Sequence, residues 1–73
     1  PPVDPEQLTK KGVLAYVKGD LHGALAVLLK ARAARPGYAP AWRVLGQVYE
    51  RMGDRAHARS AFGSASAKNG GTS

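Results

Sequence analysis

An internal repeat constrains the fold of this 73-residue chain more than any other feature of its sequence. The dipeptides Gly19-Asp20 and Gly53-Asp54 stand one fixed offset apart, and Gly12 and Gly46 are separated by the same offset, which we call the repeat period. Apolar residues recur at this period: Leu8 and Trp42, Ala24 and Ala58, Leu28 and Phe62, Ala31 and Ala65. A repeat period that holds for glycine, aspartate and apolar positions alike indicates one supersecondary unit that is copied and stacked.

Each unit carries the start and stop signals of two helices. Asp4 before Pro5 is typical of an N-cap followed by proline at the first helical position. Each Gly-Asp pair can end one helix and cap the next, and Pro36-Gly37 ends the second helix. We predict helices over about residues 5–18, 21–34 and 40–52, and a fourth that follows Gly53-Asp54 and ends near residue 68. No stretch alternates as a strand would.

The predicted helices are amphipathic. Leu21, Leu25 and Leu28 recur at i, i+4 and i+7, which places them on one helix face. Gly12 and Gly46 lie inside helices, where glycine costs about 1 kcal/mol relative to alanine, so we expect close contact between helices at both positions. The predicted fold is all-α, with two stacked antiparallel helix hairpins that form a four-helix α-solenoid fragment.

These residues resemble the tetratricopeptide repeat family. The second unit matches its W…LG…Y…GD…A…F…A pattern at Trp42, Leu45-Gly46, Tyr49, Gly53-Asp54, Ala58, Phe62 and Ala65. The first unit matches at Gly12, Gly19-Asp20, Ala24, Leu28, Ala31 and Pro36, but it has Lys11 and Ala15 where the family prefers Leu and Tyr. The resemblance implies repeats over residues 5–38 and 39–68. Residues 1–4 are then an N-terminal linker, and the glycine-rich composition of residues 69–73 predicts a disordered tail.

Both ends of the predicted array carry charge. Arg55 and Arg59 stand one repeat period after Leu21 and Leu25, on the face that a third unit would cover. At the other end, Lys11 stands where the second unit has Leu45. Because terminal repeats need polar outer faces, we predict a two-repeat module. A core of this size supplies roughly 3–5 kcal/mol, so we expect marginal stability.

The residue types argue against catalysis and metal binding. The chain has no cysteine, and His22 and His57 are not equivalent positions of the repeat. Neither histidine has a carboxylate one turn away on its own helix, so we expect both to be solvated side chains at helix starts. Asp4, Asp20 and Asp54 are explained as helix caps. We therefore expect no catalytic residue, no metal site and no cofactor.

The resemblance implies a concave groove, lined by the first helix of each repeat, that binds an extended peptide or a partner helix. The candidate partner-binding residues are Thr9, Val13, Tyr16, Val17, Tyr38, Arg43, Gln47, Glu50 and Arg51, flanked by Glu6 and Pro40. Helical spacing independently places the four from Thr9 to Val17 on one face. An apolar half and a basic half predict a protein partner with a hydrophobic anchor beside acidic residues.

Two other uses stay open. The apolar groove residues could pack against the chain's own parent protein or a second copy, as a structural or dimerisation module. The net charge of +6 would suit sequence-independent contact with nucleic acid, but the basic residues are spread, so this use is less favoured. We expect a monomer or weak homodimer in the cytoplasm, with no membrane contact. The absence of an initiator Met and the abundance of Ala, Arg and Gly suggest a domain excised from a longer bacterial protein.

Overall fold

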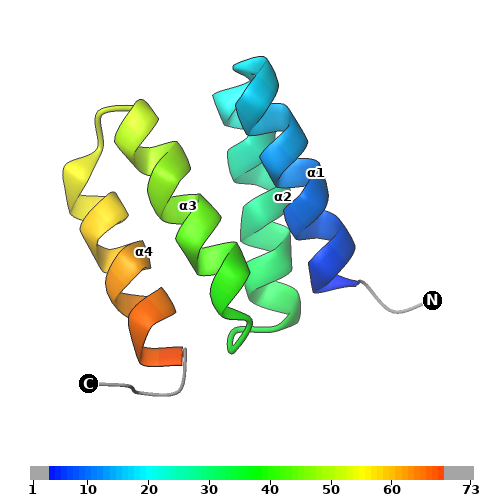
Figure 1. The fold of residues 1–73 in the computed structure, drawn as a ribbon, viewed down its shortest axis with the longest axis vertical. Coiled ribbons are helices and arrows are strands. Elements are labelled where there is room, and N and C mark those ends of the chain that lie inside the picture. The colour runs from blue at the N-terminus through cyan, green and yellow to red at the C-terminus, as the bar shows by residue number, and fades with distance from the viewer. Residues whose placement is uncertain (1–3, 69–73) are drawn as a thin grey trace.

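The computed structural model describes residues 4–68 and consists of four helices joined by short turns (Figure 1). They are α1 (Pro5–Lys18), α2 (Leu21–Ala34), α3 (Ala39–Arg51) and α4 (Arg55–Lys68). No strand occurs within this range, so the predicted all-α class is confirmed. The predicted tail at 69–73 and the first three residues of the predicted linker lie outside the described residues.

The third helix differs from the prediction by one residue at each end. It begins at Ala39, with Tyr38 as N-cap, and ends at Arg51, with Met52 as C-cap. Pro40 therefore occupies the second helical position, where its missing N–H is tolerated because that group has no partner inside the helix.

The repeat in the sequence is also a repeat of hydrogen bonds. In the first turn the Asp20 N–H donates to the Ala15 carbonyl at 2.8 Å, and one repeat period later the Asp54 N–H donates to the Tyr49 carbonyl at 2.9 Å. Gly19 and Gly53 have φ values of 87° and 84°, a left-handed conformation that glycine adopts at no steric cost. The two Gly-Asp pairs therefore build the same tight turn twice.

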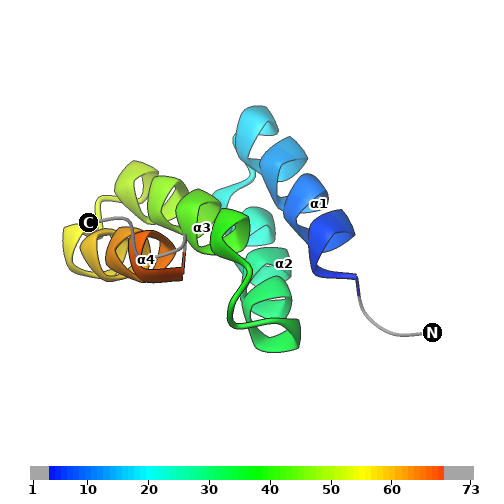
Figure 2. The ribbon, with the colours of Figure 1, turned by 60° about the horizontal axis from the view of Figure 1, so that its bottom comes forward.

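The helices form two antiparallel hairpins, α1–α2 and α3–α4. Figure 2 shows α3 next to the side of the first hairpin where α1 and α2 meet, and the backbone of α3 contacts both. The α4 helix lies along α3, on the side away from α1 (Figure 1). The second hairpin thus docks through α3, which leaves one long side of α3 and α4 without a further helix among the described residues.

A small core holds the hairpins together. Its fully buried large side chains are Leu28 from α2 and Leu45 and Val48 from α3, with Ala24 and Ala61 packed beside them. Trp42 is half-buried at the edge, where its indole Nε1–H donates to the Pro36 carbonyl at 2.7 Å. This hydrogen bond ties the loop between the hairpins to α3.

Gly12 and Gly46 lie at close contacts between helices, as predicted. A Cβ atom on Gly12 would lie 2.6 Å from Leu28 Cγ, and one on Gly46 would lie 2.7 Å from Phe62 Cε1. Both distances are shorter than real Cβ contacts allow. Because Leu28 and Phe62 are themselves one repeat period apart, each hairpin packs an equivalent glycine of its first helix against an equivalent side chain of its second helix.

Candidate partner-binding site

A pocket of about 460 Å³ lies beside α1 and holds three of the predicted partner-binding residues. We call it the α1 pocket, and its lining residues are Glu6, Thr9, Lys10, Val13, Leu14 and Tyr38. All except Tyr38 belong to α1. Tyr38 is the N-cap of α3, so the pocket is shared between α1 and the start of the second hairpin.

The rim of the α1 pocket carries exposed apolar side chains. Val13 is 38%, Leu14 60% and Val17 74% exposed, and these three stand close together in the second half of α1. Single exposed apolar residues are normal on a protein surface, but adjacent ones beside a pocket are typical of interaction sites. Leu14 and Lys10 were not among the predicted site residues; Leu14 stands one repeat period before buried Val48, on the outer face of α1.

Thr9 forms the floor of the pocket. It is only 6% exposed, and its Oγ1–H donates to the Pro5 carbonyl at 2.7 Å. The hydroxyl proton is therefore already engaged in a hydrogen bond within α1. The structure thus offers little Thr9 surface for direct contact with a partner, although the sequence predicted this residue as part of the site.

Tyr16 and Arg51 meet across the two hairpins. The guanidinium carbon of Arg51 lies 5.3 Å from the centre of the Tyr16 ring, within the range of a cation–π interaction. The sequence predicted Tyr16 in the apolar half of the groove, where it would contact an apolar side chain of the partner, and Arg51 in the separate basic half. The structure instead joins them, so that a partner reaching this point meets a charged group above an aromatic ring.

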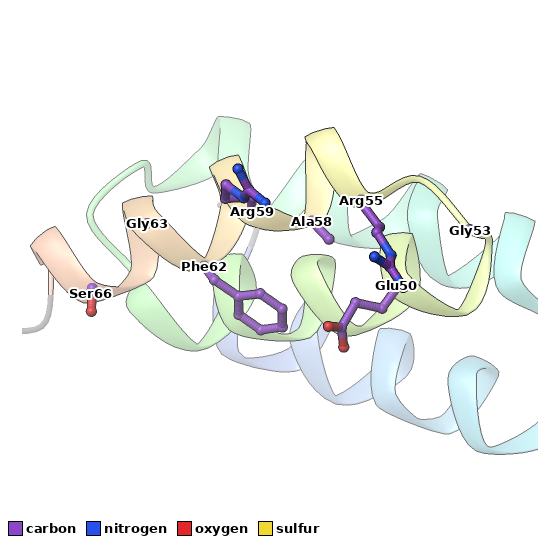
Figure 3. A pocket seen from close by; sticks show the side chains of 8 residues that line it. All are labelled: Glu50, Gly53, Arg55, Ala58, Arg59, Phe62, Gly63 and Ser66. Atoms are coloured by element: carbon purple, nitrogen blue, oxygen red, sulfur yellow. The ribbon is translucent and has the colours of Figure 1, made fainter.

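The remaining predicted residues line a different surface. Arg43 and Gln47 line a pocket of about 380 Å³ together with α4 residues, and Glu50 lines an adjoining pocket of about 880 Å³. The two pockets share Phe62 and Ser66, and we refer to them together as the α3–α4 groove. Figure 3 shows the residues that line the pocket of about 880 Å³. The predicted residues are therefore divided between two surfaces. The sequence located Arg55 and Arg59 on a terminal face without indicating that this face is hollow.

His57 has a partner that was not identified from the sequence. Its ring Nδ1 lies 2.6 Å from Asp54 Oδ2, and its ring stacks against Tyr49 with the centroids 5.0 Å apart. The prediction considered only carboxylates on the same helix and so missed Asp54, which precedes α4 as its cap and lies one helical turn before His57. Both side chains are substantially exposed, so this pair stabilises a helix start without burying charge.

Asp54 makes the stability of the second hairpin sensitive to acid. The backbone N–H of His57, which donates to Oδ1 at 3.1 Å, is the main reason that the pKa of Asp54 lies below its ordinary value of 3.8. Desolvation opposes this shift, and the side-chain hydrogen bond and charge of His57 add to it. A lowered pKa in the folded state stabilises the fold above pH 3.8, and this contribution is lost as pH falls through the folded-state pKa.

We therefore expect His57→Ala to leave most of the Asp54 pKa depression in place, because the backbone donor remains. An NMR titration of the Asp54 carboxyl carbon would measure the pKa in both proteins. In Asp54→Asn the free energy of unfolding should change less between pH 5 and pH 2.5 than in the unmodified chain, since asparagine still caps but does not titrate. A return of the pKa to its ordinary value in His57→Ala would contradict this account.

The described residues contain no group of three His, Asp or Glu side chains placed to hold a metal ion. None of the four described helices combines the length and the hydropathy that crossing a bilayer requires. Comparison with protein-family models and with curated proteins finds no match for this chain.

Proposed function

We propose that this chain is a two-repeat module of the tetratricopeptide type that binds a segment of a partner protein at the α1 pocket. The observation that carries the proposal is the placement of Val13, Leu14 and Tyr38 around one pocket beside exposed Val17. The repeated glycine contacts, the repeated turns and the docking of α3 on the first hairpin support the assignment to this class of repeat.

The partner segment carries an apolar side chain beside one or two acidic ones. The apolar side chain would enter between Val13, Leu14 and Tyr38, where burial of a Leu or Phe side chain is worth about 1.5–3 kcal/mol. An acidic group could then meet Lys10 at the pocket itself or Arg51 above Tyr16. Arg51 forms no ion pair within the described residues, so its N–H donors remain for a carboxylate.

A peptide display library selected against the 73-residue chain would test this proposal. We expect enriched peptides to share one large apolar residue with Asp or Glu nearby, and their addition to shift the amide signals of Val13, Leu14, Val17 and Tyr38. Val13→Glu should weaken binding of such a peptide about tenfold or more, which corresponds to about 1.4 kcal/mol, through lost apolar contact and added repulsion.

Ala26→Glu is the matched control, because it adds the same charge at an exposed position of α2. Its binding should stay within about twofold of the unmodified chain. Enriched peptides without acidic residues would refute the predicted partner chemistry. Equal losses in the two variants would refute the α1 pocket as the binding site.

The exposed apolar rim also favours the alternative of a dimerisation module. Leu14 and Val17 could pack against a second copy of the chain or against a neighbouring part of its parent. Sedimentation equilibrium distinguishes this alternative: a dimer that dissociates in Leu14→Ser would support it, whereas a monomer at high concentration would favour the partner segment.

A further inference from the structure

The first hairpin has a surface on which α3 packs. The equivalent surface of the second hairpin is the α3–α4 groove. In the first hairpin, Tyr16, Leu21 and Leu25 pack against the core cluster that contains Leu45 and Val48 of α3. Their equivalents one repeat period later are Glu50, Arg55 and Arg59, and all three line the α3–α4 groove. The internal repeat thus indicates that this groove is shaped to take one more helix.

The floor and the rim of the groove differ in chemistry. Figure 3 shows Phe62 in the middle of the groove, with Arg55 and Glu50 toward the Gly53 end and Ser66 toward the other end. Phe62 is the only large apolar side chain of α4, and it is half-buried rather than covered. The floor therefore offers apolar surface to a helix that lies along α4. Since α4 has 14 residues, a helix of similar length could run beside it.

Charge on the rim selects the kind of helix. Arg43, Arg55 and Arg59 are exposed around the groove, and Glu50 is the single acidic residue among its lining side chains. Arginine pairs well with carboxylates because its guanidinium presents paired N–H donors. A helix with Asp or Glu beside its apolar stripe would satisfy these arginines, whereas a basic helix would be repelled.

A second copy of this chain does not fit the groove. The face that would dock is the outer face of α1, which corresponds to the docking face of α3 and presents Lys11 and Lys18 to solvent. Stacking two copies head to tail would bring these lysines toward Arg55 and Arg59, and Lys11 would replace the buried Leu45 of the existing contact. Like charges at an interface disfavour a wrong partner, so the charged ends oppose open-ended assembly.

We infer that the α3–α4 groove is a second binding site, distinct from the α1 pocket, for an acidic amphipathic helix supplied by a partner protein. The helix lies along α4 with its apolar stripe over Phe62 and its carboxylates against Arg55 and Arg59. This site does not depend on the proposed function of the α1 pocket.

Three synthetic peptides, each about as long as α4, would test the inference against the intact chain. The first has leucine at i, i+4, i+7 and i+11 flanked by glutamate. The second has lysine in place of each glutamate, and the third has the composition of the first in an order without a stripe. We expect the first peptide to bind at least tenfold more tightly than the other two, by fluorescence anisotropy at low salt, and to shift amide signals between Gly53 and Ser66.

Neutralising the rim provides the second arm of the experiment. Arg55→Gln with Arg59→Gln should weaken binding of the first peptide about tenfold, whereas Lys11→Gln with Lys18→Gln, which removes the same charge at the opposite end, should change it by less than twofold. Glutamine keeps the helix propensity of these exposed positions, and circular dichroism would check that each variant is folded.

Three results would overturn the inference. Equal binding of the peptide without a stripe would show plain charge attraction to a basic surface. Shifts confined to Val13, Leu14 and Tyr38 would show that the peptide occupies the α1 pocket instead. Binding that the Arg55 and Arg59 neutralisation leaves unchanged would show that the rim does not recognise the helix.

Discussion

Leu45→Ala is expected to remove most of the chain's free energy of unfolding. Leu45 is completely buried in α3, the only one of the four described helices that contacts each of the other three. Replacing a buried leucine by alanine removes apolar contact and leaves a cavity, at a cost of about 2–5 kcal/mol. A single core of this size supplies roughly 3–5 kcal/mol in total, so the loss is comparable with the whole stability. Urea denaturation followed by circular dichroism would measure it.

Lys11→Ala is the matched control for Leu45→Ala. Lys11 holds the same repeat position in the first unit, one repeat period earlier, and is exposed. Its replacement should change the free energy of unfolding by no more than about 0.5 kcal/mol. If Leu45→Ala were as stable as Lys11→Ala, the core described above would not be what holds the hairpins together.

Gly12→Ala is expected to destabilise the first hairpin by on the order of 1–2 kcal/mol, which is the balance of two opposing effects. The added Cβ would lie 2.6 Å and 2.7 Å from Leu28 Cγ and Cδ2, and Leu28 is completely buried, so it has no space into which to move. Overpacking of this kind costs about 1–3 kcal/mol, which outweighs the gain of up to about 1 kcal/mol from the better helix propensity of alanine. Gly46→Ala should cost less, because the Phe62 ring it would meet is only half-buried.

Gly63→Ala is the same chemical change with the opposite expected sign. Gly63 lies inside α4 and is exposed, and a Cβ there would meet no atom within 4 Å. Only the effect of helix propensity remains, so this variant should be more stable by about 0.5–1 kcal/mol. Thermal unfolding of the three glycine variants would separate close packing from propensity. A stabilised Gly12→Ala would show that α1 and α2 are not in close contact there.

The local features of the fold were predictable because they depend on neighbouring residues. A glycine that adopts positive φ and an aspartate that caps the next helix act within one turn of the chain, so Gly19-Asp20 and Gly53-Asp54 located two of the three connections. The glycines of the helix contacts were predictable for a different reason. Gly12 and Gly46 are costly inside a helix, and their recurrence at the repeat period indicated a shared packing role.

The sequence alone therefore determined the four helices, their pairing in hairpins and the charged ends of the array, since spacing, capping and repetition are properties of the chain itself. Only the tertiary structure decided which surfaces are hollow. Docking of α3 on the first hairpin brings Tyr38 to α1 and Arg51 to Tyr16, and packing of α3 on α4 places Arg43 and Glu50 in pockets that α4 residues also line. These neighbours are set by the distance and angle between helices, which arise from the packing of side chains far apart in the sequence.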